Sequence, residues 1–123
     1  MIIKNIQDVC LNVILIPRQE KKVNESTYSL LKKSSYFETY NQITVEAIRQ
    51  VLLEHPDCID DWIQYSEDQR CHPTWFFRQD TTDYEVGFVS LDANDVPVTK
   101  YQDRFEACAT FIKNKFELVR QIP

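Results

Sequence analysis

A single glycine, Gly87, is present in the 123 residues, and this scarcity excludes several fold classes. Loops that bind phosphate groups need several glycines, because only a backbone without Cβ atoms approaches the anion closely. The sequence therefore predicts neither a Walker-type NTPase nor a Rossmann dinucleotide-binding domain. Gly87 itself lies among bulky residues of a β-rich run, where it indicates a bulge or space for a ring on the adjacent strand.

Length and composition predict a single domain, residues 1–123, with one hydrophobic core. Apolar residues make up 43% of the chain, and the seven Phe, six Tyr and two Trp argue against disorder. The first 17 residues are apolar but contain polar side chains such as Lys4 and Asp8, so they are too short and too polar to span a membrane.

The cysteines bear on the cellular compartment. We recognise no signal peptide and expect a cytoplasmic protein with buried, reduced thiols. A secreted domain with two disulfides is the alternative. Both interpretations concern the four cysteines of the chain, which are Cys10, Cys58, Cys71 and Cys108.

The N-terminal third is patterned for helices. Residues 3–14 carry apolar side chains at helical spacing and predict a short amphipathic helix, with a strand over residues 11–16 as the competing interpretation. Pro17 forbids continuation of that helix, and we interpret residues 18–24 as a polar linker. Asn24 is then expected to cap a second helix.

A third helix is expected to start at the capping residue Thr44 and to end before Pro56, which serves as the first residue of a fourth helix over residues 56–69. One face of this fourth helix is built for the core, with Ile59, Trp62, Ile63 and Ser66. A polar stripe lies on another face, because spacings of four, three and four residues keep its members aligned. The stripe consists of Asp57, Asp61, Gln64 and Asp68, flanked by Asp60 and Glu67.

The C-terminal half changes character. Two β-rich runs, residues 74–78 and 84–89, predict a hairpin, and residues 96–101 predict a third strand at the sheet edge, where Pro97 is tolerated. A helix from Asp103 follows, with a buried stripe of Phe105, Cys108, Ala109, Ile112 and Phe116. The order predicts an α+β fold: N-terminal helices, a three-stranded antiparallel meander, and a C-terminal helix packed on the sheet.

Negative charge is concentrated in the middle of the chain. Residues 54–103 contain twelve carboxylates but only three fixed cations, in a chain of net charge −5. Such a block predicts a basic partner, because complementary fields steer association. The alternative is a solvated face that maintains solubility. The acidic pI of about 5.0 argues against direct binding of nucleic acid.

A metal or catalytic site is a separate interpretation. His55, Cys58, Cys71 and His72 have ligand types that suit Zn²⁺, but Cys71 and His72 are adjacent, whereas structural zinc sites separate their ligands by a spacer. The acids on the helix lack a neighbouring nucleophile or oxyanion-stabilising group. We therefore expect no metal, no cofactor and no enzymatic activity. A small metal-binding protein or enzyme that uses Cys71 and His72 is the alternative.

Aromatic residues near the polar stripe are candidate anchors for a partner. Tyr65, Trp75 and Phe76 are each as well explained by partner contact as by packing. Trp62 and Phe77 are better explained as core residues.

Four segments carry a family resemblance: residues 59–70, 74–77, 84–88 and 101–112, about half of the chain. They resemble a group of small bacterial immunity proteins that guard polymorphic-toxin and contact-dependent growth-inhibition systems. The resemblance implies a non-enzymatic cytosolic protein that binds and neutralises a cognate toxin domain, often a basic nuclease. It identifies no binding residues.

The charge pattern and the resemblance together predict an immunity protein whose acidic surface occludes the active cleft of a toxin nuclease. An adaptor domain is a further alternative. The predicted toxin-binding residues are Asp57, Asp60, Asp61, Gln64, Glu67 and Asp68 on the helix, with Asp80, Asp83 and Glu85 in the hairpin as secondary choices.

Overall fold

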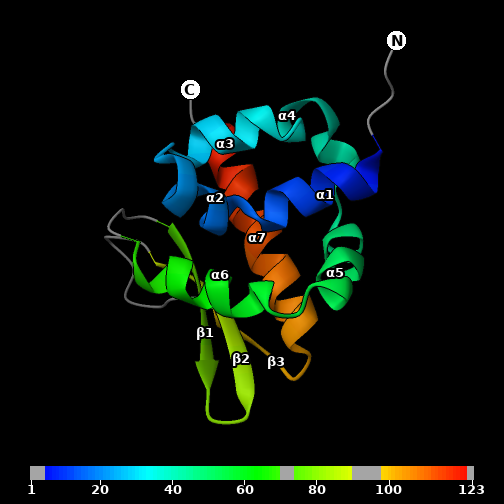
Figure 1. Cartoon of the computed structure of the whole chain (residues 1–123). Coiled ribbons are helices and arrows are strands. Elements are labelled where there is room, and N and C mark those ends of the chain that lie inside the picture. Colours follow the sequence, from blue (N-terminus) through cyan, green and yellow to red (C-terminus); the bar gives the residue numbers. More distant parts are fainter. Residues whose placement is uncertain (1–4, 70–73, 90–97, 122–123) are drawn as a thin grey trace.

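The computed structural model describes residues 5–69, 74–89 and 98–121 (Figure 1). Within these ranges the elements are α1 (Ile6–Ile14), α2 (Ile16–Val23), α3 (Thr27–Lys33), α4 (Tyr36–Thr39), the 3-10 turn η1 (Tyr40–Gln42), α5 (Val45–Glu54), α6 (Cys58–Glu67), β1 (Thr74–Asp80), β2 (Asp83–Val89), β3 (Val98–Tyr101) and α7 (Arg104–Gln121). This order confirms the predicted α+β fold. No helix in the described part of the chain is both long and apolar enough to cross a lipid bilayer.

The three strands form an antiparallel meander in the order β1-β2-β3, as predicted. Pairing is continuous along β1 and β2, so Gly87 marks no bulge. Gly87 instead lies directly opposite Phe76, which it leaves room to accommodate, and the Arg78 guanidinium covers the Phe76 ring at 4.8 Å from its centroid. The third strand is described from Val98 onward; the predicted positions 96 and 97 lie outside the described residues.

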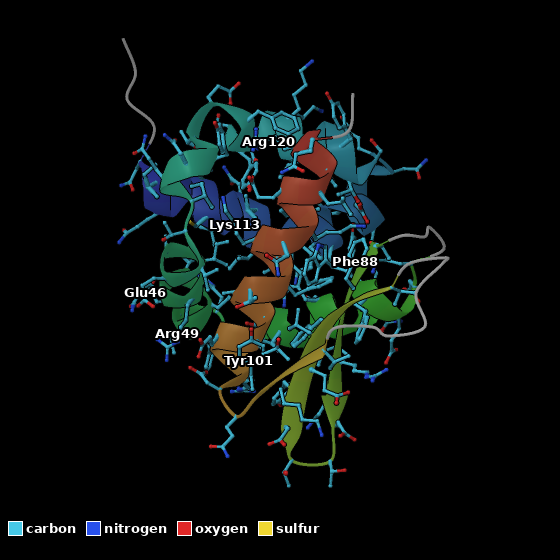
Figure 2. The ribbon with its side chains drawn as sticks, turned by 180° about the vertical axis from the view of Figure 1, so that it is seen from behind. Glu46, Arg49, Phe88, Tyr101, Lys113 and Arg120 are labelled. Carbon is cyan, nitrogen blue, oxygen red and sulfur yellow. The ribbon has the colours of Figure 1, made fainter. Side chains whose placement is uncertain are left out.

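Helix α7 packs between α5 and the sheet, as Figure 2 shows from behind, with Arg49 of α5 on one side of it and Phe88 of β2 on the other. Four members of its predicted stripe are fully buried, namely Cys108, Ala109, Ile112 and Phe116, and Phe105 is half-buried. The Asp103 carboxylate accepts a hydrogen bond from the Phe105 N–H at 2.9 Å, and Arg49 pairs with it at 2.8 Å. This arrangement confirms the packing predicted for the C-terminal helix.

Trp62 joins three helices in the core, as predicted for this residue. Its ring is fully buried and contacts Phe111 and Phe116 of α7, with ring centroids 6.0 and 5.7 Å away. Its indole N–H donates to the Ile14 carbonyl at the end of α1, at 3.0 Å. A buried indole N–H needs such a partner, so this hydrogen bond fixes α6 against α1.

The prediction of a linker over residues 18–24 is wrong, because this segment belongs to helix α2. Pro17 ends α1 but then occupies the first turn of the next helix, where its missing N–H removes no intrahelical hydrogen bond. The strand considered for residues 11–16 is also wrong, since α1 continues to Ile14.

Two helix ends also differ from the prediction. Asn24 does not cap α3: it ends α2 in the left-handed conformation, with φ of 55°, and Ser26 caps α3 instead. Thr44 caps α5 as predicted, accepting from a backbone N–H at 3.1 Å. The fourth predicted helix, α6, begins at Cys58 and not at Pro56, which lies in the preceding turn.

Candidate functional site

Helix α6 presents the predicted polar stripe to solvent. Ile59 and Trp62 bury the opposite side of the helix, and the helical period therefore turns the acids outward. Asp61 is half-buried, and the other predicted residues of this helix face are exposed: Asp57, Asp60, Gln64, Glu67 and Asp68.

Arg18 of α2 occupies the N-terminal half of the stripe. Its Nε lies 2.5 Å from Asp61 Oδ2, and its Nη2 lies 2.6 Å from Asp57 Oδ2. These two carboxylates are one helical turn apart, so one guanidinium reaches both. The hydrogen bond from Arg18 holds the pKa of the Asp57 carboxyl below its usual value. One guanidinium against two carboxylates offsets about half of the charge in this part of the stripe, and the contact attaches α2 to α6.

The Arg18 contact predicts a pH-dependent effect of Arg18→Ala. Because the folded-state pKa of Asp57 is lowered, the pair stabilises the fold above the unfolded-state pKa and loses this effect as pH falls through the folded-state value. We expect Arg18→Ala to lower the urea midpoint at neutral pH and to have almost no effect at a pH below the folded-state pKa of Asp57. Equal losses at both pH values would show that the variant acts through packing alone.

The remaining acids of α6 are exposed. None of the ion pairs among the described residues involves Asp60, Glu67 or Asp68. Their charges are therefore not offset by a contacting cation in residues 5–69, 74–89 and 98–121. Together with Gln64 they form what we call the open acidic face.

The hairpin acids lie apart from this face. Figure 1 shows the turn between β1 and β2 projecting beyond the helices, away from α6, and Asp80 and Asp83 flank that turn. Glu85 is only 7% exposed and pairs with Arg78 at 2.6 Å and with Lys100 at 3.9 Å. Its charge is thus balanced within the sheet, whereas the exposed Asp80 and the half-buried Asp83 form no ion pair among the described residues.

A groove of about 520 Å³ borders the open acidic face. It lies between α2, α3, α6 and α7, and most of its exposed lining is apolar. The groove was not predicted, because α2, which supplies part of one wall with the start of α3, was predicted as a linker. The signal that could have indicated it is Pro17, since proline is also common in the first turn of a helix. Its lining includes the aromatic residues Tyr28 and Tyr65 and the polar residues Asp61, Gln64 and Asp68.

The aromatic walls of the groove are held by packing. The Tyr65 ring meets buried Trp62 edge-on at a centroid distance of 5.1 Å, and its hydroxyl lies 2.9 Å from Thr27 Oγ1. Tyr28 is 53% exposed, and its ring rests on Phe37 at 5.5 Å. The groove therefore presents the Tyr65 ring, which two contacts hold within the fold, and the more exposed Tyr28 ring, which packs on one neighbouring ring. Ordering of Tyr65 before a partner binds lowers the entropic cost of binding.

Only some of the residues considered as zinc ligands belong to the described part of the chain. Cys58 is buried in the core, and burial raises the pKa of its thiol. Cys71 and His72 lie outside the described residues. Within the described ranges no three potential metal ligands gather. Cys10 and Cys108 are likewise buried free thiols, and burial raises the pKa of Cys10 to about 11.

Comparisons of the chain with protein-family models, curated proteins and solved structures find no match. The resemblance to bacterial immunity proteins therefore stays a prediction. The fold and the site define a small α+β domain with an exposed acidic helix face beside a groove that is partly lined by aromatic rings.

Proposed function

We propose that this chain is a binding protein that neutralises a basic toxin domain, as an immunity protein does. The observation that carries the proposal is the open acidic face of α6, whose carboxylates have no contacting cation in the described residues and which borders an apolar groove. Three such carboxylates beside one groove give a local concentration of negative charge that a basic partner can use.

The acidic face of α6 and the neighbouring groove together have the features of a protein-binding surface. Binding energy in protein interfaces concentrates in aromatic anchors within pockets, surrounded by a polar rim. Tyr28 and Tyr65 supply rings in the groove lining, Gln64 and Asp68 supply polar groups of the same lining, and the exposed Glu67 lies next to them on α6. Rim carboxylates accelerate encounter with a positively charged partner and disfavour acidic ones.

The proposed mechanism is occlusion of a basic cleft. A nuclease binds phosphates with Arg and Lys side chains, and Asp60, Glu67 and Asp68 would take the places of those phosphates. The chain itself binds no nucleic acid in this mechanism, and it acts in the cytoplasm, where its target's substrate is found. Asp80 and Asp83 make a second contact only with a partner that reaches the hairpin turn.

The direct test is inhibition of a toxin domain encoded next to this chain. We expect nuclease activity to fall in proportion to added protein and to vanish at an equimolar ratio, with no effect on an unrelated basic nuclease as the control. Undiminished activity at a molar excess would contradict the proposal. Zinc bound to the purified protein and lost in a Cys71→Ser, His72→Ala variant would favour the alternative metal-binding function.

A further inference from the structure

The chain already contains one example of how α6 binds a guanidinium group. Arg18 approaches the stripe from α2 and contacts Asp57 and Asp61, which are separated by one helical turn. The stripe continues for another turn with Gln64 and Asp68, at the same kind of spacing. No ion pair among the described residues uses Asp68, and both Gln64 and Asp68 are exposed, whereas Arg18 contacts the first half of the stripe.

We propose that the groove beside this second half binds an arginine side chain of the partner protein. The guanidinium group sits at Asp68 and the Gln64 carbonyl against the Tyr65 ring, and the aliphatic stem lies along Tyr28. The identity of the partner rests on the function proposed above, but the chemistry of the groove does not. The volume of about 520 Å³ exceeds one side chain, so residues that flank the arginine also enter the groove.

Arginine fits this groove better than lysine does. Its planar guanidinium group stacks on aromatic rings and donates in two directions at once, whereas a lysine ammonium is a compact and strongly hydrated charge. The groove offers both features, with an aromatic wall at Tyr65 and acceptors on Gln64 and Asp68 one turn apart.

Two lysines also line the groove, and they provide the opposing possibility. Lys115 Nζ donates to Thr74 Oγ1 at 2.8 Å, and Lys21 lies on α2. Should these cations determine what the groove accepts, an acidic side chain would bind there in place of arginine. The test therefore includes an acidic probe.

The experiment uses ¹⁵N-labelled full-length protein and three capped tripeptides, acetyl-Gly-X-Gly-amide, in which X is arginine, citrulline or glutamate. We expect the arginine peptide to shift the backbone resonances of Gln64, Tyr65 and Asp68 in a saturable manner. Citrulline has nearly the same shape without the charge, so it should bind about fivefold more weakly.

Two matched variants locate the effect. Asp68→Asn should weaken binding of the arginine peptide about fivefold, because it removes the carboxylate at the groove. Asp60→Asn removes an exposed carboxylate of the same helix that does not line the groove, and it should change binding less than about twofold. The spectra of both variants also report whether the fold is retained.

Three results would overturn the inference: equal binding of the arginine and citrulline peptides, stronger binding of the glutamate peptide, or arginine-dependent shifts confined to residues outside the groove. These measurements need no toxin. If the arginine peptide binds the groove and no toxin is inhibited, the inference stands and the proposed function fails; if a toxin is inhibited and the peptide does not bind there, the reverse holds.

Discussion

Replacement of Phe116 by alanine is expected to lower the free energy of unfolding by about 3–5 kcal/mol. The ring is fully buried on α7 and meets Trp62 of α6 and Tyr36 of α4, at centroid distances of 5.7 and 6.0 Å. Its removal leaves a cavity where three helices meet, and none of them can close it without giving up its other contacts. The loss therefore combines reduced apolar burial with the cost of the cavity.

Phe105 provides a matched control on the same helix. It is only half-buried, and Arg104 covers its ring at 4.9 Å, so Phe105→Ala deletes the same atoms from a site that water can fill. We expect urea or guanidinium melts to show a clearly smaller loss for Phe105→Ala than for Phe116→Ala. A loss below about 1 kcal/mol for Phe116→Ala would mean that α7 does not form the core.

The parts of the fold that local pattern determines were predictable. The buried stripe of α7, the core position of Trp62 and the cap at Thr44 each follow from spacing or from a side chain that satisfies a nearby N–H. The antiparallel meander follows from three β-rich runs that succeed one another along the chain. These features need no knowledge of distant residues, which explains why sequence reasoning found them.

The N-terminal third was less predictable because a proline such as Pro17 is compatible with two local structures. A proline ends one helix and equally well starts another, and the polar residues after it have the composition of a linker. Asn24 is similarly ambiguous, since asparagine both caps helix starts and tolerates the left-handed conformation at helix ends. Helix α4 and the 3-10 turn η1, in residues 36–42, are too short for a helical spacing of apolar residues to be recognised in the sequence.

The candidate site depends on contacts that sequence spacing does not contain. The pairing of Arg18 with Asp57 and Asp61 spans 39 and 43 residues, and it divides a stripe that looks uniform in the sequence into a filled half and an open half. The burial of Glu85 beneath Arg78 and Lys100 likewise depends on strand register. Acids of identical type thus differ in availability for reasons that are tertiary.

The difference between paired and unpaired acids on α6 determines which charge reversals can test binding of the toxin. Reversal of Asp57 or Asp61 would place lysines against Arg18 and separate α2 from α6, so weakened binding could result from a damaged fold. Asp60, Glu67 and Asp68 are exposed and have no ion pair among the described residues. Their joint reversal to lysine should leave the urea midpoint nearly unchanged.

Association with the toxin should respond far more strongly to this triple reversal. We expect the association rate at low salt to fall on the order of ten- to a thousand-fold, since attraction is replaced by repulsion, and the difference from the unaltered protein to shrink as salt rises. Any of the three carboxylates that is buried against a toxin Arg or Lys should add about 2–5 kcal/mol, seen as faster dissociation.

The control is a second triple reversal at Glu38, Glu46 and Glu106, exposed acids on α4, α5 and α7 that change the net charge by the same amount; Figure 2 shows Glu46 on α5, away from the sheet. A local site on α6 requires the first triple to impair association and protection of cells much more than the second. Equal effects would mean that net charge alone steers the partner. In that case the acids of α6 maintain solubility, and the contact surface lies on the hairpin turn or the N-terminal helices.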